Sequence, residues 1–165
     1  MPDSSHWLRY VALLCSMLCL GSCGWRLQGI QRLPPAMSIT YVDAANPYSE
    51  FSRALRESLN AAGAELVKDR TQARAIIRVR RDESGQRVLS VSARNRPEEF
   101  EVFYVVEYSV EGVNGELLGV QMLERKRDYS YDEAALLAKQ REQAVLQDAL
   151  ARELAGLVMR RLAAL

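Results

Sequence analysis

The sequence predicts an α+β domain built as a two-layer sandwich. Two helices pack on one face of a mostly antiparallel four-stranded sheet, in the order β-α-β-β-β-α. The strand signal is clearest over residues 100–110, where apolar side chains occupy every second position. The helix signal appears twice, as apolar residues at helical spacing in residues 46–63 and 132–165. A helix between the first two strands favours a parallel pair with a right-handed crossover, whereas the later strands form an antiparallel meander.

The first strand and the first helix lie close together in the sequence. Residues 37–42 alternate apolar and polar side chains, which is typical of a short strand. Asn46 suits the N-cap of a helix, and Pro47 suits its first position. Gly63 suits the C-terminal end because glycine adopts the left-handed conformation at little steric cost. Between these ends, one apolar face is formed by Phe51, Leu55 and Leu59.

Three further strands are predicted in the middle of the chain. The first is expected to contain a turn or a bulge at residues 82–86, around Gly85, before its alternation resumes. Asn114 and Gly115 predict a hairpin turn because both residues tolerate a positive φ. The three expected strands cover residues 75–93, 100–110 and 117–129.

The last third of the chain is predicted to be helical. Asp132 is a suitable N-cap, and a broad apolar stripe follows it. Because each helix has one apolar face, we expect both to cover the same side of the sheet, against the even-numbered residues of 100–110. The odd-numbered face keeps Phe103 and Val105 among charged residues, which suggests that something covers it. The stripe of the last helix consists of Leu146, Leu150, Leu154, Leu157, Val158, Leu162 and Leu165.

The N-terminus has the features of a secretory signal peptide. Arg9 precedes a short apolar run at residues 10–20, which is shorter than the roughly 20 residues of a membrane-spanning helix. The tetrapeptide Leu-Gly-Ser-Cys that ends at Cys23 resembles the bacterial lipobox, in which cleavage precedes the cysteine and its thiol carries a diacylglycerol. The predicted division is a signal peptide over residues 1–22, a lipidated tether over 23–36 and a single α+β domain over 37–165.

Two other interpretations of Cys23 stay open. The chain could be an ordinary secreted protein with a chance cysteine at the cleavage point, or Cys23 could be buried in an uncleaved anchor. If the lipobox is used, cleavage removes His6, Cys15 and Cys19, and the one remaining thiol carries lipid.

The residues that remain after cleavage exclude several kinds of metal and catalytic site. Without histidine or a free cysteine, there is no Cys/His zinc site, no Ser-His-Asp triad and no thiol nucleophile. We therefore expect no enzyme, no metal and no cofactor. A formal net charge of +1 on an exported chain also argues against nucleic acid as a partner. Two carboxylate pairs are interpreted as solvated charges at a turn and a helix start, namely Glu98/Glu99 and Asp132/Glu133.

Several short motifs follow one another in a distinctive order. They are CGWRLQG at residues 23–29, SRAL at 52–55, RVLSV at 87–91 and FEVFY at 100–104, followed by the apolar final helix. In this order and spacing they resemble the LPS-assembly lipoprotein family LptE. The resemblance implies an outer-membrane lipoprotein, lipid-anchored on the periplasmic side, that plugs the large β-barrel LptD. It also implies that the chain helps this barrel fold and binds lipopolysaccharide on its way to the cell surface.

Three basic residues are candidates for lipopolysaccharide binding. Arginine forks match phosphate oxygens bidentately, and lysine supplies a point charge. Arg94 and Arg96 lie in the turn before residue 100, and Lys139 lies in the first turns of the last helix. The resemblance matches Arg94 and Lys139 most closely, and the choice between Arg94 and Arg96 stays open.

Two functions of other classes remain. One is a periplasmic hydrolase that uses Glu or Asp with Tyr, which the lack of histidine disfavours. The other is a free-standing periplasmic lipoprotein that binds cell-wall glycan or another envelope complex. Copurification with a large barrel would separate these alternatives from an LptE-like role.

Overall fold

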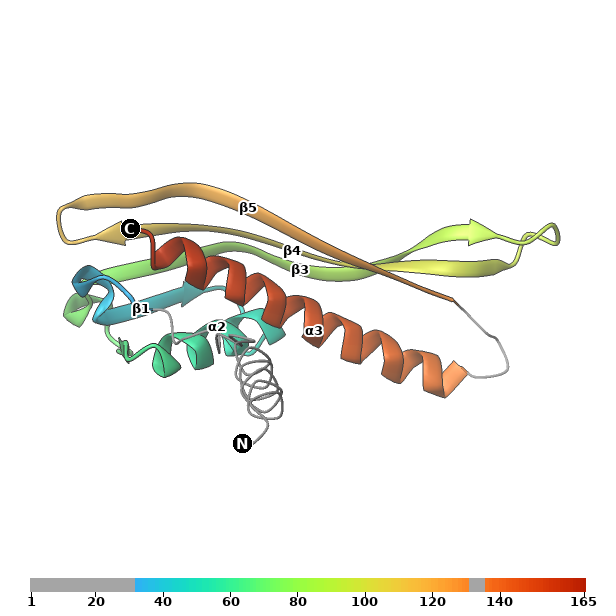
Figure 1. Cartoon of the computed structure of the whole chain (residues 1–165), viewed down its shortest axis with the longest axis horizontal. Coiled ribbons are helices and arrows are strands. Elements are labelled where there is room, and N and C mark those ends of the chain that lie inside the picture. Colours follow the sequence, from blue (N-terminus) through green and yellow to red (C-terminus); the bar gives the residue numbers. More distant parts are fainter. Residues whose placement is uncertain (1–31, 131–135) are drawn as a thin grey trace, which may run out of the picture.

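The computed structural model describes residues 32–130 and 136–165 of the chain. In this part, five strands form one sheet in the order β2-β1-β3-β4-β5, and two long helices lie on one side of it (Figure 1). Residues 1–31 and 131–135, which include Cys23 and Asp132, lie outside the described residues. The strands are β1 (Ile39–Ala44), β2 (Glu65–Leu66), β3 (Ala75–Val91), β4 (Pro97–Gly112) and β5 (Gly115–Ser130), and the α-helices are α2 (Glu50–Ala61) and α3 (Leu136–Leu162).

The α+β class and the placement of both helices on one face are confirmed, but the sheet is mixed and has five strands. The extra strand, β2, pairs with β1 in parallel over only two residues, and two residues are too few to show a period. β1 also pairs in parallel with β3, as the intervening helix predicted. The remaining pairs, β3 with β4 and β4 with β5, are antiparallel.

β3 is one long strand, so the turn or bulge expected at residues 82–86 is wrong. Its register shifts lie outside that segment, between Val79 and Arg81 and again between Val88 and Val91. The strand continues because β4 supplies a ladder partner along its whole length. At Gly85 the partner is Phe103, and a Cβ added to Gly85 would lie 2.7 Å from the Phe103 ring. Glycine therefore allows the aromatic ring to lie across the backbone of β3.

The predicted core is confirmed. The even-numbered β4 residues from Val102 to Val110 are at most 1% exposed. They face α2 through Phe51, Leu55 and Leu59, and face α3 through the central part of its apolar stripe. Met37, just before β1, is also fully buried, and Leu33 packs against the core. The last residues of the predicted tether therefore lie against the domain.

The first helix starts later than expected. Its N-cap is Ser49, whose Oγ accepts a hydrogen bond from the Ser52 backbone N–H at 3.0 Å. Asn46 instead accepts from the backbone N–H of Tyr48, which makes a separate turn before the helix. Gly63 follows the helix with a φ of +86°, as its predicted role requires. The β4–β5 hairpin also forms, although only Gly115 there has a positive φ.

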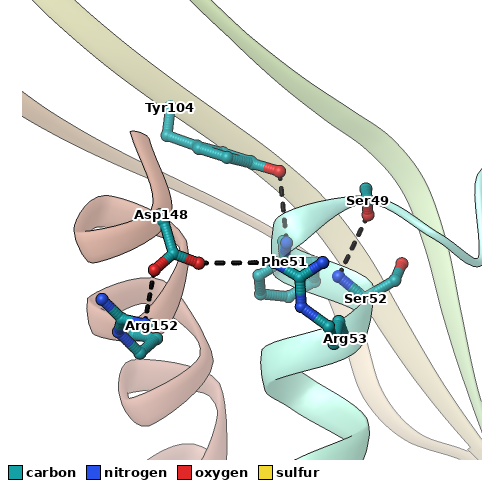
Figure 2. Close-up of polar contacts among 7 residues, drawn as sticks. All are labelled: Ser49, Phe51, Ser52, Arg53, Tyr104, Asp148 and Arg152. Atoms are coloured by element: carbon teal, nitrogen blue, oxygen red, sulfur yellow. Dashed lines mark hydrogen bonds and ion pairs between the residues drawn. The ribbon is translucent and has the colours of Figure 1, made fainter. Parts of the chain in front are cut away.

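A buried tyrosine ties α2 to the sheet. The hydroxyl of Tyr104 accepts a hydrogen bond from the Phe51 backbone N–H at 3.3 Å and donates one to Asp82 at 2.7 Å. Ser49 donates to the same Asp82 carboxylate. Figure 2 shows Tyr104 reaching from β4 to the first turn of α2. Burial, together with the Asp82 carboxylate, raises the pKa of Tyr104 well above its usual value, so the hydroxyl keeps its proton.

The two helices are joined on their outer side. Arg53 of α2 lies 3.4 Å from Asp148 of α3, and Arg152 pairs with the same carboxylate (Figure 2). Both arginine side chains are more than half exposed. Exposed ion pairs contribute little to stability, so the contact between the helices depends mainly on their apolar faces.

Candidate functional site

The β3–β4 hairpin extends past the rest of the sheet. Figure 1 shows its green and yellow strands running beyond the end of β5 to a loop at the far right. The last residue of β5, Ser130, pairs with Glu99, and among the described residues only β3 and β4 continue beyond this pair. We call residues 88–99 the tip and the rest of the described chain the body. The tip is a narrow ribbon that β5 still borders at Glu99, and past the pair of Ser90 with Glu99 only two strands remain in the part of the chain that the structure describes.

The turn at the end of the tip is held by hydrogen bonds to Ser92. Its backbone N–H donates to the Arg96 carbonyl at 2.8 Å, and its Oγ accepts from the Arg96 backbone N–H at 3.1 Å. Asn95 has a φ of +58°, a left-handed conformation that asparagine tolerates better than most residues. This turn, residues 92–96, is called the apex. It presents Arg94 and Arg96 as exposed side chains.

Lys139 occupies a different place. It lies in the first turns of α3, 2.8 Å from Glu142 and 5.8 Å from the centre of the Tyr129 ring, and its side chain is 18% exposed. Tyr129 belongs to the end of β5, where the tip leaves the body. The structure therefore puts Lys139 at the root of the tip and the two arginines at the apex, and the three do not form one cluster.

The root of the tip is an aromatic junction that the sequence analysis missed. Phe100 and Tyr129 stack with ring centres 5.9 Å apart, and the Tyr129 hydroxyl donates to Gln86 Oε1 at 2.9 Å. These contacts tie together β3, β4 and β5 at the point beyond which β5 stops. The available signal was that the strands predicted over residues 100–110 and 117–129 have aromatic residues at corresponding ends, Phe100 and Tyr129.

On the face of the sheet opposite the helices, charged side chains pair with one another around Phe103. Lys126 lies 3.8 Å from Glu101 and 3.2 Å from Glu124, and Arg87 pairs with Glu101. The guanidinium of Arg87 also lies 5.7 Å from the centre of the Phe103 ring. These long side chains shield Phe103, which explains how it lies among charges without a further layer of structure. Met122, which pairs with Glu107 on the same face, stays 65% exposed.

The basic stretch at the end of β5 does not extend the candidate site. Arg125 and Arg127 face α3, where both pair with Glu153, whereas Lys126 points to the other face of the sheet. Strand alternation separates these three side chains, as the period of two requires.

A hollow of about 240 Å³ lies between α2 and the ends of β1 and β2. It includes the basic side chains of Arg56 and Lys68, and an Arg56 Nη donates to the Val42 carbonyl at 3.5 Å. None of the three candidate basic residues lines it. The hollow is therefore separate from the apex and from the root of the tip.

The tip also contains one of the predicted carboxylate pairs. Glu99 accepts a hydrogen bond from Ser90 Oγ at 2.8 Å, and Glu98 is exposed. Over residues 32–130 and 136–165, no group of three or more His, Cys, Asp or Glu side chains is placed to hold a metal ion. Among the helices of the same residues, none is long and apolar enough to cross a bilayer.

Comparison with known proteins decides the family. The model of the lipopolysaccharide-assembly family LptE matches residues 37–162, nearly the whole described body and the tip. The chain belongs to the LptE family. A member from Pectobacterium atrosepticum, the LPS-assembly lipoprotein LptE, is 24% identical over 158 residues, which cover 95% of this chain and 85% of that protein.

Solved structures support the same fold for this LptE family member. The solution structure of an uncharacterized lipoprotein B from Nitrosomonas europaea superposes with a TM-score of 0.71 at 26% identity, covering 86% of this chain and 91% of that one. The rare lipoprotein B from Shewanella oneidensis gives a TM-score of 0.67 at 25% identity, with coverages of 76% and 94%. The overall fold is thus shared with other lipoproteins.

Proposed function

We propose that this protein is an outer-membrane lipoprotein that partners an LptD-type β-barrel, aids its assembly and binds lipopolysaccharide for delivery to the outer leaflet. The single observation that carries this proposal is the match of the LptE family model over residues 37–162. The exposed basic apex supports it, because lipopolysaccharide carries phosphates that arginine forks bind well. The protein acts in this role as a binding and assembly factor, without catalysis.

The lipid anchor is proposed at Cys23. The lipobox-like tetrapeptide and the preceding apolar run support it. Each methylene of an acyl chain buried in the membrane contributes about 0.8 kcal/mol, so several chains on one cysteine hold the protein at the bilayer firmly. The tether ends within a few residues of Leu33, which packs against the core, and this keeps the domain near the periplasmic face of the membrane.

The basic residues have different proposed roles in binding. Arg94 and Arg96 are exposed at the apex and make the first contacts with phosphates. Lys139 is mostly covered and paired with Glu142, so it adds a contact at the root of the tip only when a phosphate displaces that carboxylate. This division predicts that the arginines contribute more to capture than Lys139 does.

Lipopolysaccharide capture by the membrane-extracted protein tests the proposed site. The double variant Arg94→Asp, Lys139→Asp is expected to bind at least tenfold more weakly, because two attractive charges become repulsive. Arg74→Asp is the matched control, since Arg74 is exposed and precedes β3 at the other end of that strand. Unchanged capture by the double variant, with an unchanged melting temperature, would remove these residues from the site.

The barrel partnership needs its own measurement. Intact-mass analysis of the extracted protein and its copurifying partner is expected to show acyl chains on Cys23 and a large β-barrel. The Cys23→Ser variant is expected to lack the acyl mass and to leave the membrane fraction. Recovery with peptidoglycan alone, and no barrel, would favour the free-standing glycan-binding lipoprotein instead.

A further inference from the structure

The tip has an exposed group of aliphatic side chains. Val88 and Leu89 are each 49% exposed and Val91 is 52% exposed, although all three lie within four residues of one strand. Single exposed aliphatic residues are common on protein surfaces, but a contiguous group of them marks a binding surface. We call these three residues the apolar band.

The apolar band lies on an open strand edge. β3 pairs with β1 only as far as Val79, and beyond this point its free side has no strand partner among the described residues. Charged residues protect the nearer part of that edge, from Arg80 to Glu83, whereas residues 88–93 carry no charge. The edge is thus polar near the body and apolar near the apex.

The two faces of the ribbon are exposed together. Val88 pairs with Phe100 and continues the face that the helices cover in the body, whereas Ser90 pairs with Glu99, the next residue of β4, on the opposite face. The register shifts between these two pairs, so Leu89 is the extra residue of a β-bulge where the strand turns from one face to the other. Docking on a flat protein surface would bury only one of these faces. Flexible chains that lie along the edge contact both faces at once, which favours an occupant made of acyl chains.

The charged residues around the apolar band indicate which chemical groups the ligand has besides its acyl chains. Arg94 and Arg96 follow the band at the apex, whereas Glu98 and Glu99 stand on β4, across the ribbon from the open edge. An anionic amphiphile is therefore attracted to the apex and repelled from the β4 side. This arrangement directs its acyl chains to the β3 edge and its phosphates to the arginines.

We propose that Val88, Leu89 and Val91 form an acyl-chain subsite for lipopolysaccharide, with the phosphates held at the apex. The proposal rests on the proposed function and deepens it, because the basic residues alone explain only the phosphate contact. The subsite lets one short ribbon bind both halves of the amphiphile, so that acyl chains remain partly shielded from water during transfer.

Deacylated lipopolysaccharide provides the decisive comparison, since it keeps the sugars and phosphates but lacks the chains. The full chain, extracted from membranes, is expected to bind intact lipopolysaccharide at least tenfold more tightly than the deacylated form. The variant Val88→Thr, Leu89→Thr, Val91→Thr keeps a high strand propensity and should lose this preference while still binding the deacylated form. Arg94→Asp should weaken binding of both forms.

These outcomes separate two kinds of failure. If neither form binds to the wild-type protein, the proposed function fails. If both forms bind equally, or if the threonine variant keeps the preference at an unchanged melting temperature, the acyl subsite is wrong although lipopolysaccharide binding stands.

A fluorescence measurement tests the location directly. Leu89→Trp, in a protein whose Trp25 is replaced by phenylalanine and whose Trp7 is removed with the signal peptide, is expected to shift its emission to the blue when lipopolysaccharide is added. A matched Tyr48→Trp variant reports on an exposed site in the body and should not shift. An equal shift with phosphatidylglycerol vesicles overturns the assignment to lipopolysaccharide. A shift with the copurified barrel and no added lipid overturns it in favour of a protein contact.

Discussion

The same two strands, β3 and β4, build both the body and the tip, yet the two regions differ in what covers them. In the body, the even-numbered β4 residues are at most 1% exposed beneath α2 and α3. In the tip, neighbouring aliphatic residues of β3 are about half exposed, on the strand edge that β1 leaves open and at the level where β5 ends. The difference indicates that the body supplies the stability, and that the tip is free to bind because its fold does not depend on burying its side chains.

The largest expected difference in stability between the body and the tip is at a buried leucine of the core. Leu55→Ala removes a fully buried side chain of α2 and is expected to lower the free energy of unfolding by about 2–5 kcal/mol, because a cavity remains. Leu89→Ala, the matched change in the tip, should cost about 1 kcal/mol or less. Chemical denaturation measures both. Similar losses would show that the tip is also part of the cooperative core.

A smaller effect is expected from the polar tie between α2 and the sheet. Tyr104→Phe removes the hydroxyl that accepts from Phe51 N–H and donates to Asp82, at a cost of about 1–3 kcal/mol. Tyr48→Phe, at an 87% exposed site, is the control and should be neutral. Thermal unfolding measures both variants, and a neutral Tyr104→Phe would show that the helix is held by apolar packing alone.

Tyr104 also makes the stability of the folded protein depend on pH. Its pKa in the folded protein lies above the unfolded value near 10, so the unfolded chain loses this proton first as the pH rises. The stability that Tyr104 contributes is therefore complete below about pH 10 and is lost at higher pH. Tyr104→Phe should reduce this alkaline loss without abolishing it, because burial also raises the pKa of Tyr108.

The smallest expected effect tests where the boundary between the body and the tip lies. Tyr129→Phe removes the hydrogen bond to Gln86 but keeps the stacked ring, and should cost about 0.5–1.5 kcal/mol. Because this bond lies at the root, amide exchange should quicken in residues 88–99 and stay unchanged in residues 102–110. Equal acceleration in both segments, measured by hydrogen exchange, would contradict a boundary at this junction.

Much of the body could be predicted because its side chains repeat with a clear period. The alternation over residues 100–110 identified β4 and its buried face, and the apolar spacing of Phe51, Leu55 and Leu59 identified α2. The predicted elements were wrong where contacts with residues distant in the sequence override the local sequence pattern. β3 continues through Gly85 because β4 pairs with it. α2 begins at Glu50 because the preceding Ser49 side chain caps the helix and contacts Asp82.

The candidate site was predicted less completely. The sequence placed Arg94 and Arg96 in a turn, and the turn lies at the apex. It grouped Lys139 with them, whereas Lys139 lies at the root beside Tyr129. The apolar band went unnoticed because Val88, Leu89 and Val91 have the composition of an ordinary half-buried strand.

By itself, the sequence determined the fold class, the faces of the main strand and helices, the family resemblance and the residue types available for binding. The tertiary structure alone decided which of these residues stay exposed. The physical reason is that periodicity specifies the direction in which a side chain points, while exposure depends on where the neighbouring elements end. Here the pairing of β5 ends at Ser130 and β1 pairs no further than Val79, so over residues 32–130 and 136–165 no strand covers the β3 edge at the far end of the hairpin.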